Sequence, residues 1–395
     1  MTNFGPWKSI SPEAKLSLLI AKALVSDTKA GAIEEFLNQE QLDWYKFNKI
    51  ITCHELSPSA YIFLKKYPEF IHQDELKLLE RHFYANLLHL NLIQQELMKI
   101  LQSFQEENII ALPLKGAHFL LDTSIYRDKA YLRPMIDIDI LLKKETYHQA
   151  QNILESQGYK MELKGNREEY WLNKNCNMAF IKMLQDNCSY IVELHWALDY
   201  PRGIRLLPHL WSRIKRIEVE GNNIYLSSPE DAFFSLILHQ RRFGNALPLK
   251  RACDAAILLT RYKGELDWDY MIEEAARGKM RTILYFALSQ IETLFDIKIP
   301  PSVLKISGVP DYKKKLIRNL LLRDTFKYSL NLNSVYLKAH FFLYDDFREP
   351  VKSILNIPQE QFAKFYNLKP YTAKTDLLYR WRYLRYLKTL ILNKY

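Results

Sequence analysis

Apolar residues recur at helical spacing through the first hundred residues of the chain. Ser11 and Pro12 form a helix start signal, because serine caps a helix amino terminus and proline fits the first helical turn. Between residues 74 and 104 the apolar positions lie three and four residues apart, which predicts one long amphipathic helix. We therefore expect an N-terminal region built of helices.

The pattern changes to short strands at residue 109. Residues 109–114 are almost wholly apolar, which is typical of a buried strand, and helical spacing resumes at Ala117. Polar and apolar residues alternate at the start of the segment 136–142, as in a strand with one face toward the core. Spacing and turn signals then predict a helix over residues 145–157 that ends at Gly158, strands over 177–183 and 189–198 joined across 185–187, and a hairpin of 217–219 with 224–226.

A second helix start signal, Ser228 followed by Pro229, precedes a stretch that keeps helical spacing to the end of the sequence. The predicted fold is α+β, with a core built on a small mixed β-sheet between two helical regions. The boundaries that we expect are 1–105 for the N-terminal helical region, 106–228 for the sheet-containing core and 229–395 for the C-terminal helical region. The two helical regions are expected to form the walls of a cleft over the sheet.

Length and charge narrow the class of protein. The chain has 395 residues, more than one hydrophobic core usually serves, which agrees with several packed units. Its formal net charge of +10 favours a polyanionic partner such as a nucleoside triphosphate (NTP), a nucleic acid or an acidic surface. The sequence has no leader pattern and no apolar run of about 18 residues, so we expect a cytoplasmic protein without integral membrane association. Its four cysteines form no C-x-x-C pair, and reduced thiols are expected.

Two aspartates occupy alternate positions in the strand expected over residues 136–142. Asp137 and Asp139 should share one face, with Cα atoms roughly 6.5–7 Å apart. Two carboxylates held at that separation repel one another unless a cation lies between them. The intervening isoleucines are expected to point into the core: Ile136, Ile138 and Ile140.

A third carboxylate comes from a later strand. Glu193 lies between two apolar residues, Val192 and Leu194, and should face the same way as His195. Three carboxylates from neighbouring strands suit Mg²⁺, which prefers oxygen ligands and completes its shell with substrate phosphates. Two such ions can stabilise both the attacking and the leaving oxygen of a displacement at phosphorus. Glu193 is also a candidate base for the proton of the attacking group.

The turn between the strand and the helix after residue 114 has the residues of a phosphate site. Gly116 allows close approach of the backbone, a helix amino terminus offers N–H groups, and Lys115 adds a positive charge. Arg133, just before the aspartates, is a second phosphate candidate. His195 can orient the acceptor or a phosphate, although a structural role beside Trp196 also explains it. Lys115, Gly116, Arg133 and His195 are therefore the expected contacts to a bound nucleotide.

The order and spacing of these segments resemble the uncharacterised bacterial nucleotidyltransferase family of the DNA polymerase β superfamily. In the core, the resemblance rests on Leu114-Lys115-Gly116, on Arg133 ahead of residues 137–142, and on residues 192–196. It spans residues from about 85 to 290. In the helical half it continues through Pro229-Glu230-Asp231, Ile237-Leu238-His239, the segment 250–254 and the segment 266–269.

The resemblance implies a catalytic core that holds Mg²⁺ or Mn²⁺ on Asp137, Asp139 and Glu193, with an NTP such as ATP at the glycine turn. Such an enzyme transfers a nucleoside monophosphate to an acceptor and releases pyrophosphate. The acceptor stays open: a small molecule, a protein or an RNA. Ala117 departs from the Gly-Ser pair of polymerase-type members, so a hydroxyl that would contact the triphosphate is missing.

Two other functions remain open on the same residues. A phosphotransferase would use the carboxylates to move the γ-phosphoryl group of the NTP. A catalytically inactive nucleotide-binding or scaffolding protein would keep the pocket alone, and Ala117 favours this alternative.

Several charged residues have both a functional and a structural explanation. Arg241-Arg242 and Lys250-Arg251 lie near expected helix ends and can reach a base or a triphosphate, although solvated positions also explain them. His239 is expected in the core, and Asp267 as a helix cap instead of a metal ligand. In the basic, aromatic tail we favour a stripe that faces the core over a nucleic-acid or membrane surface: Leu377, Leu378, Trp381, Leu384 and Leu387.

Overall fold

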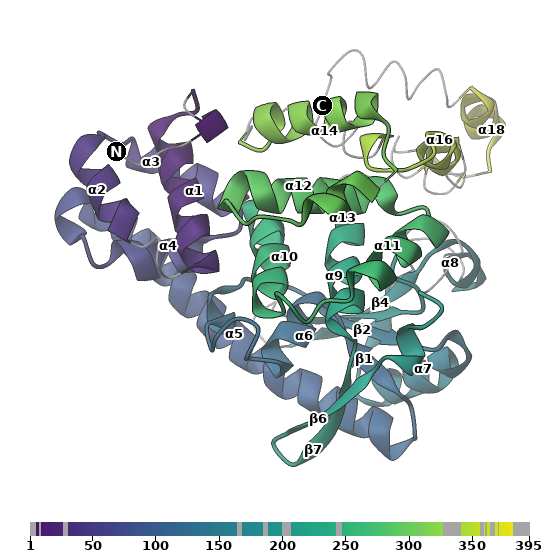
Figure 1. Ribbon diagram of the computed structural model, residues 1–395. Helices are drawn as coiled ribbons and strands as arrows, with labels where there is room; N and C mark the ends of the chain where they lie inside the picture. The colour runs from purple at the N-terminus through teal and green to yellow at the C-terminus, as the bar shows by residue number, and fades with distance from the viewer. Residues whose placement is uncertain are drawn as a thin grey trace.

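The computed structural model of the chain describes most residues between 5 and 381 (Figure 1). Within that span it leaves out residues 8, 27–30, 164–167, 185–188, 200–206, 242–246, 307, 327–340, 356–358, 360–361, 364–367 and 370. No helix among the described residues is both long and apolar enough to cross a lipid bilayer.

The N-terminal region is helical, as the spacing predicted. Helix α1 begins where the start signal lies: the Ser11 side chain accepts a hydrogen bond from the Ala14 N–H. The long amphipathic helix is α5, which runs beneath the other N-terminal helices toward the sheet (Figure 1). The helices of this region are α1 (Pro12–Val25), α2 (Gly31–Gln39), α3 (Trp44–Cys53), α4 (Ser57–Leu64) and α5 (Gln73–Glu106).

The sheet is small and mixed. Its order is β1-β2-β5-β4-β3, in which β2 and β5 run parallel and the other neighbours run antiparallel. The strands are β1 (Ala111–Pro113), β2 (Ile138–Leu142), β3 (Lys160–Met161), β4 (Asn177–Met183) and β5 (Ser189–His195). The helices between them are α6 (Lys115–Leu121), α7 (Tyr147–Ser156) and α8 (Glu168–Lys174). The segment expected to join β4 to β5 lies outside the described residues.

A separate hairpin of β6 (Lys215–Val219) and β7 (Asn222–Leu226) follows the sheet and extends away from it (Figure 1). Glu220 and Gly221 both have positive φ angles, 52° and 78°, as a two-residue hairpin turn requires. The turn is therefore shorter than the four-residue loop expected from the sequence, because the two asparagines after it belong to β7.

The C-terminal region is helical in its described part, which confirms the α+β class. Ser228 caps α9 by accepting from the Asp231 N–H, and Asp267 caps α11 by accepting from the Tyr270 N–H, so both expected caps are confirmed. The helices are α9 (Pro229–Leu238), α10 (Leu249–Arg261), α11 (Trp268–Arg277), α12 (Arg281–Phe295), α13 (Pro301–Ile306), α14 (Asp311–Asp324), α16 (Arg348–Leu355) and α18 (Ala373–Arg380).

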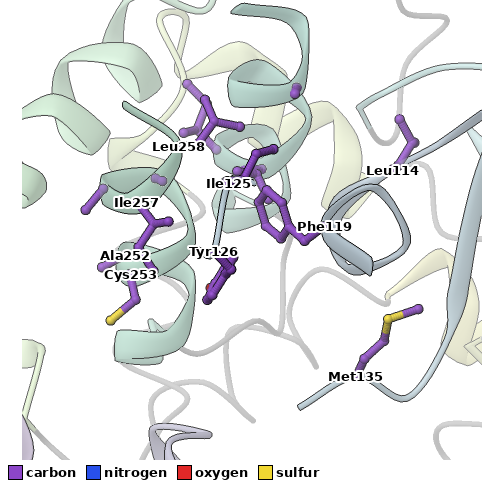
Figure 2. Close-up of a cluster of buried hydrophobic side chains, with 14 of the residues drawn as sticks. Leu114, Phe119, Ile125, Tyr126, Met135, Ala252, Cys253, Ile257 and Leu258 are labelled. Atoms are coloured by element: carbon purple, nitrogen blue, oxygen red, sulfur yellow. The ribbon is translucent and has the colours of Figure 1, made fainter. Parts of the chain in front are cut away.

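Buried apolar side chains connect the three expected regions. One hydrophobic cluster extends from Trp7 to Leu343, and helix α1 contacts both α10 and α12. Figure 2 shows a part of it in which Tyr126 lies near Ala252 and Cys253 of α10, and Phe119 of α6 lies beside Ile125. The side chains that connect α6 to α10 are thus apolar and buried. The boundaries at 105 and 228 stay predictions.

Two expectations about apolar residues are wrong. Ile136 is 70% exposed and precedes β2, which begins at Ile138, so it does not point into the core. In the tail, Leu377 and Trp381 are each 59% exposed, which contradicts a stripe that faces the core over this part. Leu384 and Leu387 lie outside the described residues.

Candidate functional site

The register of β2 against β5 places two of the expected carboxylates side by side. Asp139 lies directly opposite Glu193 in this parallel pair. The flanking residues on both strands are fully buried and point to the opposite face: Ile138, Ile140, Val192 and Leu194. The apolar positions therefore fix the register, and the register fixes the two carboxylates on one face of the sheet.

His195 lies behind these carboxylates and joins them. Its Nε2 atom is 2.8 Å from Asp139 Oδ1 and 3.3 Å from Glu193 Oε2. One ligand atom from each of the three side chains lies within 4.8 Å of the other two, so the group could hold a metal ion. On the neighbouring strand, Asn177 Nδ2 donates to Glu193 Oε2 at 2.5 Å. Sequence reasoning missed Asn177, because its place opposite His195 follows only from the β4–β5 register.

Lys115 reaches the same cluster from the turn before α6. Its Nζ atom donates to Asp139 Oδ1 at 2.7 Å, and its backbone has a positive φ of 51°, which is uncommon for a residue with a side chain. The N–H groups of Ala117 and His118 donate to the Leu114 carbonyl and are used within the turn. The Lys115 ammonium is thus the part of this turn that meets the carboxylates.

Charge is unevenly distributed over the cluster. Repulsion by Asp139, followed by burial, raises the pKa of Asp137 to about 6. Burial alone would raise the pKa of Asp139, but Lys115 and His195 hold it well below its usual range. Burial would lower the pKa of His195, but its hydrogen bonds to the acids raise it to about 10. Asp139 therefore stays ionised, while ionisation of Asp137 is less favourable than that of an ordinary aspartate.

A pocket of about 240 Å³ opens beside Asp137 and Asp139. It draws its lining from all three regions of the sequence, which agrees with the expected cleft over the sheet. The lining residues are Glu55, Lys115, Gly116, Arg133, Pro134, Met135, Ile136, Asp137, Asp139, Leu236, His239, Lys250, Arg251 and Asp254. Glu193 and His195 are not among them. His195 is buried, so its geometry supports a role in holding the acids and gives no contact to a nucleotide in this pocket.

Arg133 lines the pocket, but its guanidinium is already bound. Its Nε and Nη2 atoms each lie 2.9 Å from an oxygen of Asp254, and the Tyr126 hydroxyl donates to the same carboxylate. Burial would lower the pKa of Arg133, but the charge and hydrogen bonds of Asp254 raise it above its ordinary value. Sequence reasoning did not find Asp254 as the partner, although it lies in the same segment as Lys250 and Arg251.

The remaining sequence candidates divide into two groups. Lys250, Arg251 and His239 line the pocket, so His239 is half-buried at its wall instead of in the core. Arg241 is buried, forms an ion pair with Asp199 and is not part of the lining. Arg242 lies outside the described residues.

Gly116 and Ala117 have different neighbours. A Cβ atom at Gly116 would lie 2.6 Å from Met135 Sδ and also too close to the Arg133 guanidinium. The glycine therefore leaves room for the side chains of Arg133 and Met135 to pack against the turn. Ala117 is fully buried in the hydrophobic cluster and does not line the pocket, so the side chain at that position packs in the core.

We expect Gly116→Ala to lower the free energy of unfolding by about 1–3 kcal/mol, because Met135 and Arg133 must both move. Arg133 cannot move without disturbing its ion pair with Asp254. Urea denaturation measures the change. Gly31→Ala is the matched control, because nothing lies within 4 Å of a Cβ atom there and the residue is in a helix. An unchanged stability for Gly116→Ala would contradict the close packing of Met135 and Arg133 against this residue.

The fold and the site define an α+β protein with a carboxylate cluster on a small mixed sheet, of a kind that can hold a metal ion beside a pocket lined by both basic and acidic side chains. Compared with known families, residues 40–296 match the family described as uncharacterised nucleotidyltransferase, and the chain belongs to that family. The match includes every residue that lines the pocket. A search of curated proteins finds no match.

Proposed function

We propose that the chain is a divalent-metal-dependent nucleotidyltransferase of the DNA polymerase β superfamily. It takes an NTP such as ATP, transfers the nucleoside monophosphate to an acceptor and releases pyrophosphate. The observation that carries the proposal is the pairing of Asp139 with Glu193 across parallel strands, with Asp137 two residues from Asp139 at the pocket. Membership of the nucleotidyltransferase family supports the reaction class.

The residues fit a hard divalent cation. The repulsion that raises the pKa of Asp137 is the kind that a cation between the carboxylates relieves. Carboxylate oxygens are also the ligands that Mg²⁺ prefers. Asp137, Asp139 and Glu193 would hold Mg²⁺ or Mn²⁺, and the bound ion would stabilise the charge that develops during transfer at phosphorus.

The other residues of the cluster supply charge and orientation. Lys115 contacts Asp139 and lines the pocket, so its ammonium can also contact a phosphate placed there. Arg133 adds positive charge at the pocket while Asp254 fixes its orientation. His195 and Asn177 hold the Glu193 carboxylate in place. Burial would raise the pKa of Glu193, but the hydrogen bond from His195 lowers it, so an ionised carboxylate is available to accept a proton.

Glu193→Gln should lower kcat by about tenfold or more and leave NTP affinity within about twofold. Glu193 does not line the described pocket, so nucleotide binding depends on it less than the chemical step does. Calorimetry gives the affinity and single-turnover kinetics gives the rate. Glu218→Gln, on the exposed side of β6, is the control. Equal weakening of binding and rate would mean that Glu193 has no special part in the chemical step.

Product analysis tests the reaction. The protein is incubated with Mg²⁺ and ATP labelled on the α-phosphorus or the γ-phosphorus, together with small hydroxylated molecules, proteins and RNA in turn. Transfer of the α-label with release of pyrophosphate supports the proposal. Transfer of the γ-label with release of ADP would assign a phosphotransferase. Binding of ATP without any transfer would indicate an inactive nucleotide-binding protein.

A further inference from the structure

The pocket has a second basic wall, formed by the first turn of α10. Lys250 and Arg251 both line it. The Lys250 ammonium donates to the Glu55 carboxylate, which comes from the corner between α3 and α4, and to the Pro134 carbonyl at 3.3 Å. A residue of the N-terminal region is thus the counter-ion of a lysine in the proposed substrate pocket.

The position of Lys250 is fixed by the residue before Glu55. His54 Nδ1 accepts from the Leu249 N–H at 3.3 Å, and the His54 carbonyl accepts from the Lys250 N–H at 3.2 Å. His54 is buried, and burial lowers its pKa to about 4, so it acts as a neutral acceptor. Two amides at the start of α10 are therefore occupied, so this wall offers side chains to a ligand, and that of Lys250 is held in a defined position.

The two members of the ion pair differ in access to water. The side chain of Lys250 is 13% exposed, whereas that of Glu55 is 35% exposed. Loss of Glu55 would leave the largely buried ammonium of Lys250 without its nearest anion, and an anion that enters the pocket would offset that cost. Glu55 can turn into solvent at less cost. Of the three N–H donors of Lys250, two are used among the described residues, so a third is available in the pocket.

The rest of the lining indicates which anion would enter. Four basic side chains line the pocket together with four carboxylates: Lys115, Arg133, Lys250 and Arg251 with Glu55, Asp137, Asp139 and Asp254. A phosphate group matches these features, because it accepts several hydrogen bonds from ammonium and guanidinium groups and binds metal ions as well.

We propose that Lys250 is a phosphate-binding residue of this pocket and that Glu55 is its exchangeable counter-ion, released when a phosphate group of the ligand enters. This deepens the proposed function, on which it rests for the identity of the ligand: the phosphate belongs to the NTP or to a phosphorylated acceptor. Phosphate binding itself can be measured without turnover, so the two proposals can fail separately.

The first test is calorimetry with inorganic tripolyphosphate in EDTA. Lys250→Met should weaken binding by about tenfold or more, because a charge-assisted hydrogen bond is lost, and Lys250→Arg should stay within a few fold of wild type. Lys182→Met is the matched control. Like Lys250, Lys182 forms an ion pair with a glutamate, in this case the largely buried Glu96 at 2.8 Å. Lys182 lies on β4 and does not line the pocket. Equal affinities in wild type and Lys250→Met would overturn the proposal.

The second test concerns the exchange. Glu55→Gln should bind tripolyphosphate about threefold to tenfold more tightly, because the competing carboxylate is gone, and Glu96→Gln should bind like the wild type. In the Lys250→Met background, Glu55→Gln should have no effect. An equal gain with and without Lys250 would indicate a general charge effect and would overturn the counter-ion role. If Lys250→Met does not fold, an unchanged affinity of Glu55→Gln overturns the proposal by itself.

The source of the phosphate follows from a second titration. Tripolyphosphate binding that depends on Lys250 assigns the residue to the NTP. Orthophosphate binding that depends on Lys250 only with saturating ATP present assigns it to a phosphorylated acceptor. If neither tripolyphosphate binding nor orthophosphate binding depends on Lys250, the inference is refuted, even if nucleotidyl transfer is observed. Lys250-dependent binding without any transfer would leave the inference intact and refute the proposed function.

Discussion

Asp137→Asn is expected to lose about a thousandfold or more in transfer rate and to unfold at the same temperature as the wild type or a higher one. The loss corresponds to about 4 kcal/mol of transition-state stabilisation, at roughly 1.4 kcal/mol per factor of ten, which is a reasonable contribution for one ligand of a catalytic metal. Asparagine keeps the shape of the side chain but removes the charge that binds the cation.

The stability of this variant follows from the pKa of Asp137. Repulsion by Asp139 raises that pKa to about 6, so ionisation of Asp137 costs the folded state free energy. The penalty is absent below about pH 4, where the carboxyl is protonated in both states, and is complete above about pH 6. In EDTA, the variant should therefore gain stability relative to the wild type as the pH rises through this window.

Turnover and urea denaturation of Asp137→Asn should be measured on the same preparation. Asp376→Asn, in the exposed part of α18, is a control of the same chemistry outside the pocket. A transfer rate equal to that of the wild type would show that Asp137 holds no catalytic metal.

Asp139→Asn should lose transfer to a similar extent and should also lose about 3 kcal/mol or more of unfolding free energy. Asp139 is 3% exposed, and its Oδ1 atom accepts from both Lys115 and His195. Removal of the carboxylate leaves a buried ammonium without its counter-ion and removes the main cause of the raised pKa of His195.

From strand alternation alone, both aspartate variants would be expected to keep the fold, because neither side chain should face the core. The structure distinguishes the two variants, because Asp139 accepts hydrogen bonds from two cationic groups, the ammonium of Lys115 and the buried imidazole of His195. Asp137→Asn is thus the natural control for Asp139→Asn, with the same substitution two residues away. Equal stabilities for the two variants would contradict the network around Asp139.

The strands that carry Asp139 and Glu193 could be predicted because their pattern is local, whereas Asp137 precedes β2 and lies outside the sheet. Alternation of aspartate with isoleucine defines a strand face, and the apolar neighbours of Glu193 do the same on β5. The alternation misled at Ile136, where the segment is not yet in the sheet and the side chain is exposed. Local pattern gives the face of a residue only where the strand is paired.

Partners from distant parts of the chain could not be predicted. Arg133 and Asp254 are 121 residues apart, and Lys250 and Glu55 are 195 apart. Sequence reasoning identified both basic residues as phosphate candidates, but nothing near them indicated that a carboxylate already binds each one. These contacts depend on how the helical regions pack on the core, which spacing along the chain does not encode.

The central claim is that Asp137, Asp139 and Glu193 hold the catalytic metal ion. Anomalous X-ray diffraction from crystals grown with Mn²⁺ and a non-hydrolysable NTP analogue tests it most directly, because manganese scatters anomalously and binds similar oxygen sites. We predict a manganese peak bonded to carboxylate oxygens of Asp137, Asp139 and Glu193, with phosphate oxygens of the analogue beside it, and its loss in Asp137→Asn. A bound analogue with no manganese at these carboxylates, or with manganese at a different site, would contradict the account.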